Sequence, residues 1–226
     1  MSHPQPFKNH PLADFSIADV RRALTNALSS LEERRRGGAF FAAPMIGGKT
    51  EKTGDIFTRT DPSDTTLEIG KTYYATPELT VKALATCSQG FAAWRARSSE
   101  ERACIVEKLG ILIRDNAPLF SALLIREAGK PWREADADVA EAIDFCLYYA
   151  EEMRRLGQPL LTEQVLGEEN FYFYQPRGVV AVIAPWNFPL AIACGMVAAA
   201  LVTGNTVILK PSEQTSIVAY ELSKLI

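Results

Sequence analysis

The sequence predicts an α/β fold in which helices come first and a parallel sheet begins near the carboxyl end. Three observations predict it. Much of the chain up to Gly157 carries apolar residues at helical spacing. Residues 179–184 are continuously apolar, residues 206–209 read TVIL, and a helix-length apolar segment separates these two runs. Buried strands joined by a helix form a βαβ unit. We therefore expect N-terminal helices plus the first βαβ unit of an incomplete parallel sheet.

The first predicted helix lies within residues 12–36 and ends at Gly37 and Gly38. Its apolar positions are spaced by three and four residues: Ile17, Val20, Leu24, Leu28 and Leu31. This spacing is typical of an amphipathic helix. Residues 39–74 are rich in Gly, Pro, Thr and Asp, with β-leaning runs at 39–46, 55–60 and 66–74. They predict extended strands and turns, not a linker.

Cap and stop residues predict the next three helices. Thr76 and Pro77 begin a helix that reaches about residue 95, and its expected buried stripe is Val81, Leu84, Ala85, Phe91 and Ala92. Ser98 and Glu101 form a capping box before the second, because serine and glutamate at this spacing satisfy each other's backbone N–H groups. Residues 117–128 form the third, which stops at Gly129.

A longer helix is predicted to begin at Pro131. Its expected buried face is apolar and comprises Val139, Ala142, Ile143, Cys146, Tyr149, Ala150 and Met153. We expect the acidic side chains to fall largely elsewhere on the helix: Glu134, Asp136, Asp138, Glu141 and Asp144.

Composition points to a globular protein without a special partner. The chain has 226 residues, 47% of them hydrophobic, and a formal charge of −3, which suggests one or two domains. Lysine and arginine are interspersed with acidic residues, so we expect no nucleic-acid partner. The basic run Glu32–Gly38 fits a solvated helix end better than a binding site.

The sequence lacks the patterns of a secretory signal, a membrane span and a zinc site. The N-terminal residues lack the apolar region of a secretory signal, so a cytoplasmic protein is expected. The most apolar segment, Leu190–Val202, is thirteen residues long, whereas a membrane span needs about 20, so it predicts a buried helix and no membrane partner. The four cysteines have no CxxC spacing, which argues against a zinc site and a disulfide framework.

Polar residues follow both predicted parallel strands. The sequence PWN comes after the first strand and KPSE after the second. Ligands of parallel α/β sheets bind at this carboxyl edge. Lys210 at a buried strand end would need an anion, which the ribose or phosphate of a nucleotide could supply, and Glu213 could pair with it. A purely structural salt bridge remains the alternative, and no GxGxxG fingerprint supports a dinucleotide.

A resemblance adds what spacing cannot. The motif PWNFP, followed by GNTVILKPSE, resembles the cofactor-binding half of the NAD(P)-dependent aldehyde dehydrogenase superfamily. Upstream segments are similar as well, among them IGGKTEKTGDIFTRTDPSD and AAWRARSSEERACIVEKLGILI. EAGKPWREADADVAEAIDF and FYFYQPRGV most resemble the branch that oxidises L-glutamate γ-semialdehyde, the open form of 1-pyrroline-5-carboxylate, in proline degradation.

The resemblance also implies a domain organisation. Residues 1–159 would be the helical part of the cofactor-binding domain, and 178–226 the start of its Rossmann-like NAD-binding sheet. Residues 160–177 would form an oligomerisation hairpin that pairs with another subunit, and their exposed aromatic alternation suits an edge that needs cover.

Residue roles follow by the same resemblance. Asn187 would donate its side-chain amide to the oxygen of the thiohemiacetal formed from the aldehyde. Lys210 would hold the adenosine ribose with Glu213 beside it, and a carboxylate there favours NAD over NADP because it repels a 2′-phosphate. The cofactor would be lined by the backbone of Ile183, Ala184, Pro185 and Trp186.

Two further residues have open alternatives. Phe188 would wall the aldehyde tunnel, with plain core packing as the alternative. Glu141 resembles an acidic position near the substrate, with a solvated helix face as the alternative.

The family's cysteine nucleophile and glutamate base would both lie beyond residue 226. Cys194 falls in an apolar helix, where a thiol is inert and its pKa tends to rise, and Cys87, Cys104 and Cys146 are expected to be small buried hydrophobes. We therefore expect the N-terminal part of a longer NAD-dependent enzyme, inactive and poorly stable as 226 residues. The alternatives are a non-catalytic nucleotide-binding piece and a parent that acts on a different aldehyde.

Overall fold

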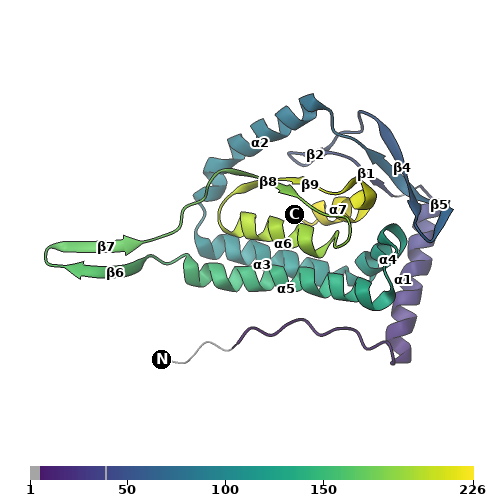
Figure 1. Cartoon of the computed structure of the whole chain (residues 1–226), viewed down its shortest axis with the longest axis horizontal. Helices are drawn as coiled ribbons and strands as arrows, with labels where there is room; N and C mark the ends of the chain where they lie inside the picture. Colours follow the sequence, from purple (N-terminus) through teal and green to yellow (C-terminus); the bar gives the residue numbers. More distant parts are fainter. Residues whose placement is uncertain (1–5, 39) are drawn as a thin grey trace.

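A computed structural model describes residues 6–38 and 40–226 (Figure 1). Its helices are α1 (Ala18–Arg36), α2 (Pro77–Arg95), α3 (Ser99–Asp115), α4 (Ala117–Ala128), α5 (Trp132–Leu156), α6 (Ala191–Val202) and α7 (Ser216–Ser223), with a 3₁₀ turn at Glu213–Thr215. Its strands are β1 (Phe41–Ala42), β2 (Met45–Ile46), β3 (Lys49–Thr50), β4 (Ile56–Asp61), β5 (Asp64–Tyr73), β6 (Leu160–Val165), β7 (Glu168–Tyr172), β8 (Val179–Ile183) and β9 (Thr206–Lys210). The α/β class with helices first is confirmed.

The elements stack in layers around β8 and β9. These strands lie between α2 on one side and α6 on the other, and α6 rests on the long helices α3 and α5 (Figure 1). One continuous apolar core joins α3, α4, α5, α6 and α7. Helix α6 is therefore packed between the sheet and the helices α3 and α5. The two-stranded sheet is covered by helices mainly on its faces.

The predicted βαβ unit is present. β8 and β9 are parallel neighbours, with Val179 opposite Thr206 and Ile183 opposite Lys210. Between α6 and β9, Gly204 has a φ of 91°, which favours glycine. The buried Asn205 side chain then accepts hydrogen bonds from two backbone N–H groups just before β8. This local geometry explains how the motif after α6 returns the chain alongside β8.

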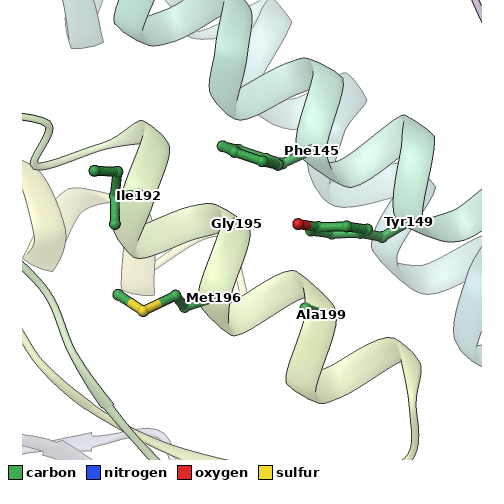
Figure 2. A pocket seen from close by; sticks show the side chains of 6 residues that line it. All are labelled: Phe145, Tyr149, Ile192, Gly195, Met196 and Ala199. Atoms are coloured by element: carbon green, nitrogen blue, oxygen red, sulfur yellow. The ribbon is translucent and has the colours of Figure 1, made fainter.

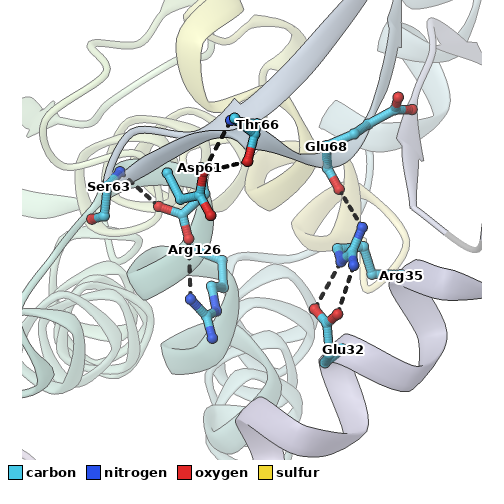
Figure 3. Close-up of polar contacts among 8 residues, drawn as sticks. Glu32, Arg35, Asp61, Ser63, Thr66, Glu68 and Arg126 are labelled. Carbon is cyan, nitrogen blue, oxygen red and sulfur yellow. Dashed lines mark hydrogen bonds and ion pairs between the residues drawn. The ribbon is translucent and has the colours of Figure 1, made fainter.

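Polar contacts attach the N-terminal sheet to the helices (Figure 3). Arg126 of α4 lies 3.1 Å from the carboxylate of Asp61, which is almost fully buried at the end of β4. Arg35 of α1 donates to the backbone oxygen of Glu68 in β5 and pairs with Glu32. These contacts place α1 and α4 against the β1-β5-β4 sheet.

The helix starts and stops were largely predictable. The Thr76 cap, the Ser98–Glu101 capping box and the Gly129 stop, with φ of 68°, are confirmed. The first helix begins at Ala18, later than the predicted range starts, and β3 was not predicted. Residues 1–5, which entered the signal-peptide argument, and residue 39, which begins one β-leaning run, lie outside the described residues.

Of the five residues in the predicted buried stripe of α2, four are exposed and so were predicted wrongly, while Phe91 is half-buried. Val81 is 68% exposed and Leu84 50% exposed, and Ala85 and Ala92 are exposed too. Another face packs on β9, where the Cys87 thiol lies 3.4 Å from the backbone oxygen of Val207, and the Trp94 indole N–H donates to the backbone oxygen of Leu201 in α6 at 3.0 Å. Apolar residues occur on two faces of α2, and spacing alone could not decide which one meets β9.

The acidic side chains of α5 also differ from the prediction. Asp138 is fully buried. Asp136 and Asp144 accept backbone N–H groups from the N-terminal segment that runs along α5, at 2.7 Å from Ala13 and 2.7 Å from His10. These carboxylates are not simply solvated, because the N-terminal segment and α6 bring N–H donors to them.

A hairpin and a buried helix were also predicted; both are present, and pairing of the hairpin with another subunit stays a prediction. The hairpin of β6 and β7 projects from the rest of the chain (Figure 1), and its aromatic residues are about half exposed: Phe171, Tyr172, Phe173 and Tyr174. α6 is a buried helix. In the part of the chain that the structure describes, no helix combines the length and apolar character needed to cross a membrane.

A buried carboxylate supports the last helix. The two carboxylate oxygens of Glu127 in α4 accept the backbone N–H groups of Ile217 and Val218, each at 2.8 Å. Burial nevertheless raises the pKa of Glu127 to about 7. The start of α7 is thereby fixed to α4 by a group that titrates near neutral pH.

Candidate active site

The carboxyl ends of β8 and β9 form an open edge. Ile183 and Lys210 are direct partners in the parallel register, and the N–H of Ala184 donates to the backbone oxygen of Lys210 at 3.0 Å. Ile183 is 71% exposed and Trp186 is 55% exposed. The edge therefore offers exposed apolar surface beside a lysine, which is a combination that can hold the sugar and base of a nucleotide.

Lys210 and Glu213 form an ion pair at this edge. The Lys210 Nζ lies 3.6 Å from the Glu213 carboxylate, and the side chains are 62% and 55% exposed. The prediction of a buried lysine is wrong, because a two-stranded sheet leaves the end of β9 uncovered. Burial of Lys210 therefore does not require an anion here, but both side chains are accessible to a ligand.

The charge of Glu213 is well defined. A hydrogen bond from its own backbone N–H, followed by the positive charge of Lys210, lowers the pKa of Glu213 below its usual value of 4.5. Glu213 is thus a carboxylate at neutral pH, and a carboxylate beside a ribose disfavours a 2′-phosphate.

A turn after β8 carries Asn187 and Phe188 to the start of α6. Asn187 is exposed, Phe188 is half-buried and packs against the core, and Leu190 is buried. Among the described residues, the side chain of Leu190, which precedes α6, accepts no hydrogen bond from the first backbone N–H groups of that helix. The first N–H of the helix is satisfied instead from α5, by Asp138.

Asp138 and Lys130 lie beneath this turn. The Asp138 Oδ1 accepts the N–H of Ala191 at 2.7 Å, and the other oxygen, Oδ2, is 2.9 Å from the Lys130 Nζ. The two side chains are 0% and 10% exposed, and Lys130 also lies 4.0 Å from the centre of the Phe188 ring. Burial raises the pKa of Asp138, with Lys130 and the Ala191 N–H acting in the opposite direction.

Glu141 lies one turn of α5 after Asp138. Partial burial raises the pKa of Glu141, and so does the negative charge of Asp138; Lys130 opposes the shift and Asp144 adds to it. Glu141 is largely exposed, so its carboxylate is accessible at this end of the α5–α6 contact.

An apolar pocket continues along the same contact (Figure 2). It is lined by Phe145, Tyr149, Ile192, Gly195, Met196 and Ala199 and has a volume of about 180 Å³. The rings of Phe145 and Tyr149 stack at 5.6 Å. A side chain at Gly195 would begin 2.8 Å from the Phe145 ring, so the glycine lets this ring pack on α6.

The cysteines were predicted only in part. Cys194 is fully buried, and a sulfur contact with Cys146 together with burial raises the pKa of its thiol, as expected. The two sulfurs are 3.4 Å apart, a contact that sequence spacing did not reveal. Cys104 is exposed, so the prediction of a buried thiol is wrong there, and Cys87 is only half-buried, where its thiol contacts the backbone oxygen of Val207 in β9 at 3.4 Å.

The predicted site residues fall into two groups. One is the edge of Ile183, Ala184, Lys210 and Glu213, and the other is the end of the α5–α6 contact with Phe188 and Glu141; Pro185, Trp186 and Asn187 connect them. Sequence reasoning missed Lys130 and Asp138. The signal was present, since Asp138 lies three residues after Ala135 and four before Ala142, within the buried stripe of α5.

Comparison with known proteins decides the family. A model described as aldehyde dehydrogenase family matches residues 49–226. The chain belongs to the aldehyde dehydrogenase family. The resemblance drawn from the motifs after β8 and β9 is thus confirmed.

Relatives of this aldehyde dehydrogenase chain narrow the comparison. It is 43% identical to the 1-pyrroline-5-carboxylate dehydrogenase of Geobacillus thermodenitrificans over 222 residues, which are 98% of this chain and 42% of the relative. 1-Pyrroline-5-carboxylate dehydrogenase 1 of Halalkalibacterium halodurans is 43% identical over 95% of this chain and 41% of its own. The chain thus spans less than half the length of these relatives.

Solved structures agree. Proline utilization A from Bdellovibrio bacteriovorus matches with a TM-score of 0.95 and 41% identity, over 100% of this chain and 23% of its own. A Thermus 1-pyrroline-5-carboxylate dehydrogenase with bound NAD matches with a TM-score of 0.91 and 36% identity, over 98% of this chain and 42% of its own.

Proposed function

We propose that this chain carries the oxyanion donor and the adenosine-binding edge of an enzyme that oxidises L-glutamate γ-semialdehyde to L-glutamate with NAD. The parallel register of β8 and β9 supports this function most directly. It brings Lys210 beside Ile183 at a carboxyl edge, and the turn that follows β8 presents Asn187. Relatives named 1-pyrroline-5-carboxylate dehydrogenase, similar over nearly the whole chain, support the substrate.

The edge residues fit a dinucleotide. Lys210 supplies a cation and Glu213 an acceptor for ribose hydroxyl groups, and Ile183 and Trp186 supply exposed apolar surface. Backbone from Ile183 to Trp186 would line the cofactor, and ionised Glu213 favours NAD over NADP. NAD, when bound, supplies the acceptor for the hydride that the aldehyde carbon loses.

The turn residues fit the aldehyde. Asn187 would donate its amide N–H to the aldehyde oxygen as that oxygen gains negative charge. Phe188 would exclude water from the aldehyde, and Glu141 would attract the positively charged amino group of a glutamate semialdehyde. Glu141 suits this role because its carboxylate is accessible. Of the charges that shift its pKa, Lys130 is the one cation, and Asp138 and Asp144 are negative.

Steady-state kinetics test this function. The protein expressed from its complete gene is assayed for NADH formation with L-glutamate γ-semialdehyde, succinate semialdehyde and propanal. We expect kcat/KM to be at least about tenfold higher for the first, because polar groups that recognise the amino acid end are left unpaired by the other two. Asn187→Ala should lower kcat by about 10² to 10³ as expected for loss of one oxyanion donor. Equal or better turnover of succinate semialdehyde would contradict the substrate.

The β6–β7 hairpin supports a second proposal, that the enzyme is a homo-oligomer assembled through residues 160–177. Phe171, Tyr172 and Phe173 are each more than half exposed on a projecting two-stranded ribbon, and such an edge is normally covered. Replacing Phe171 and Phe173 by serine should lower the mass measured by light scattering. An unchanged mass would contradict this interface.

A further inference from the structure

Lys130 and Asp138 form a buried ion pair beneath the turn that carries Asn187. The Nζ–Oδ2 distance is 2.9 Å, and the side chains are 10% and 0% exposed. Removing two charges from water costs free energy that their attraction often fails to recover, so apolar residues would stabilise such a site equally well. A buried pair is therefore better suited to fixing a geometry than to adding stability.

Each member of the pair holds a different point of the turn. The Asp138 Oδ1 accepts the N–H of Ala191, the first residue of α6, at 2.7 Å. The Lys130 Nζ lies 4.0 Å from the centre of the Phe188 ring, within the range of a cation–π interaction. Asn187 directly precedes Phe188, so the turn is fixed immediately beside the proposed oxyanion donor.

The backbone around Lys130 is itself restrained. Lys130 follows Gly129, whose left-handed conformation ends α4, and the Lys130 N–H donates to the backbone oxygen of Leu124 at 3.3 Å. The ammonium group thus starts from a fixed point between α4 and α5. Asp138 lies within α5 and Lys130 in the short connection between α4 and α5, so both are held by helices, and rigid support of this kind is what accurate positioning requires.

We propose that Lys130 and Asp138 are positioning residues that fix the Trp186–Leu190 turn and so aim the Asn187 amide at the aldehyde oxygen. This rests on the proposed function, in which Asn187 is the oxyanion donor. In this role the pair would contact neither the aldehyde nor the cofactor. It acts through Phe188 and the start of α6.

Kinetics of matched variants test the proposal. The protein expressed from its complete gene is compared with Lys130→Met, Lys130→Arg, Asp138→Asn and Asn187→Ala. The control is Arg154→Met, which removes ion pairs of α5 with Glu100 and Glu107 away from the turn. Lys130→Met should lower kcat about tenfold with little change in the KM for NAD, less than loss of the donor itself, which costs 10² to 10³. Lys130→Arg should recover most of kcat, because a guanidinium keeps the charge and the ring contact.

A double variant distinguishes positioning from general stability. If Lys130 acts through Asn187, Lys130→Met should lower kcat no further in the Asn187→Ala background. If the losses of kcat multiply in the double variant, Lys130 does not act through Asn187. The same holds if Lys130→Met and Asp138→Asn have the kcat of Arg154→Met. Either result would overturn the positioning role and leave the donor assignment in place. A kcat unchanged by Asn187→Ala would overturn the donor assignment and the positioning role together.

Hydrogen exchange gives a readout that needs no turnover. The Ala191 amide should exchange at least tenfold faster in Asp138→Ala than in the parent or in Arg154→Met. Asp138→Asn keeps an oxygen acceptor for this amide and should preserve most of the protection, so it also serves where Asp138→Ala fails to fold. Protection of Ala191 that is unchanged in Asp138→Ala, or fully lost in Asp138→Asn with the fold intact, would overturn the proposal.

Discussion

Two of the lysine–carboxylate pairs in the chain lie in contrasting surroundings. The interior pair, Lys130 and Asp138, has a separation of 2.9 Å, is almost fully buried and is shared with a backbone N–H and an aromatic ring. The edge pair, Lys210 and Glu213, has a separation of 3.6 Å, and both side chains are more than half exposed. A lysine and a carboxylate therefore have different roles in the two places. The interior pair fixes backbone geometry, and the edge pair is available to a ligand.

The largest expected difference is in stability. Asp138→Ala leaves Lys130 buried without a partner and the Ala191 N–H without an acceptor, so it should lower the free energy of unfolding by about 3 to 5 kcal/mol. Glu213→Ala should change it far less, because an exposed pair is screened by water. Urea denaturation of both variants measures the contrast. Similar losses would show that the edge pair is not as independent of the fold as its exposure indicates.

The stability contributions of the buried carboxyl of Glu127 and the exposed carboxyl of Glu213 should change with pH in opposite directions. The pKa of Glu127 is raised from 4.5 to about 7, so the folded state holds this proton more tightly. Its contribution to stability is present below pH 4.5 and is lost as the pH rises through about 7, by up to about 1.4 kcal/mol per pH unit in between. Glu213 has a lowered pKa, so its contribution is present above pH 4.5 and is lost at lower pH.

Glu127→Gln removes the titration but keeps an acceptor for the α7 backbone. The difference in unfolding free energy between this variant and the parent should therefore change between pH 5 and pH 7, roughly the interval between the two pKa values of Glu127. A pH-independent difference, measured by denaturation at several pH values, would rule out a raised pKa.

A glycine-to-alanine change at two positions compares the buried helix α6 with the surface of α2. Gly195→Ala places a carbon 2.8 Å from the Phe145 ring and should cost about 1 to 3 kcal/mol through overpacking. Gly90→Ala meets no atom within 4 Å on an exposed helix and should stabilise by about 0.5 to 1 kcal/mol. Thermal denaturation measures both signs. Adding Phe145→Leu should recover stability only in the Gly195 variant.

The smallest effect is expected at the carboxyl edge of β8 and β9, where a substitution should change NAD binding and not stability. Lys210→Ala should weaken NAD binding up to about tenfold, or about 1.4 kcal/mol, without changing the melting temperature. Isothermal titration measures the affinity, with Lys82→Ala as the control, since Lys82 forms an exposed pair with Glu51 elsewhere. Equal NAD affinity of the parent and Lys210→Ala would contradict the assignment of Lys210 to the cofactor.

Local rules predicted much of this fold. Thr76, the Ser98–Glu101 box and Gly129 mark helix ends because caps and stops depend on nearby backbone groups. The apolar runs predicted β8 and β9, and the motifs after them identified the family. The face of α2 and the burial of Lys210 were predicted wrongly, because both depend on which surfaces the rest of the chain covers.

By itself, the sequence determined the order of elements, the parallel β8–β9 pair and the residues at its carboxyl edge, since these follow from periodicity, caps and short motifs. Only the tertiary structure decided that Asp138 is buried and meets Lys130 and the start of α6. Residue 191 lies 53 residues after residue 138 in the sequence, and a charge is buried only where packing supplies its partners. The support beneath Asn187 is for that reason visible in the folded chain alone.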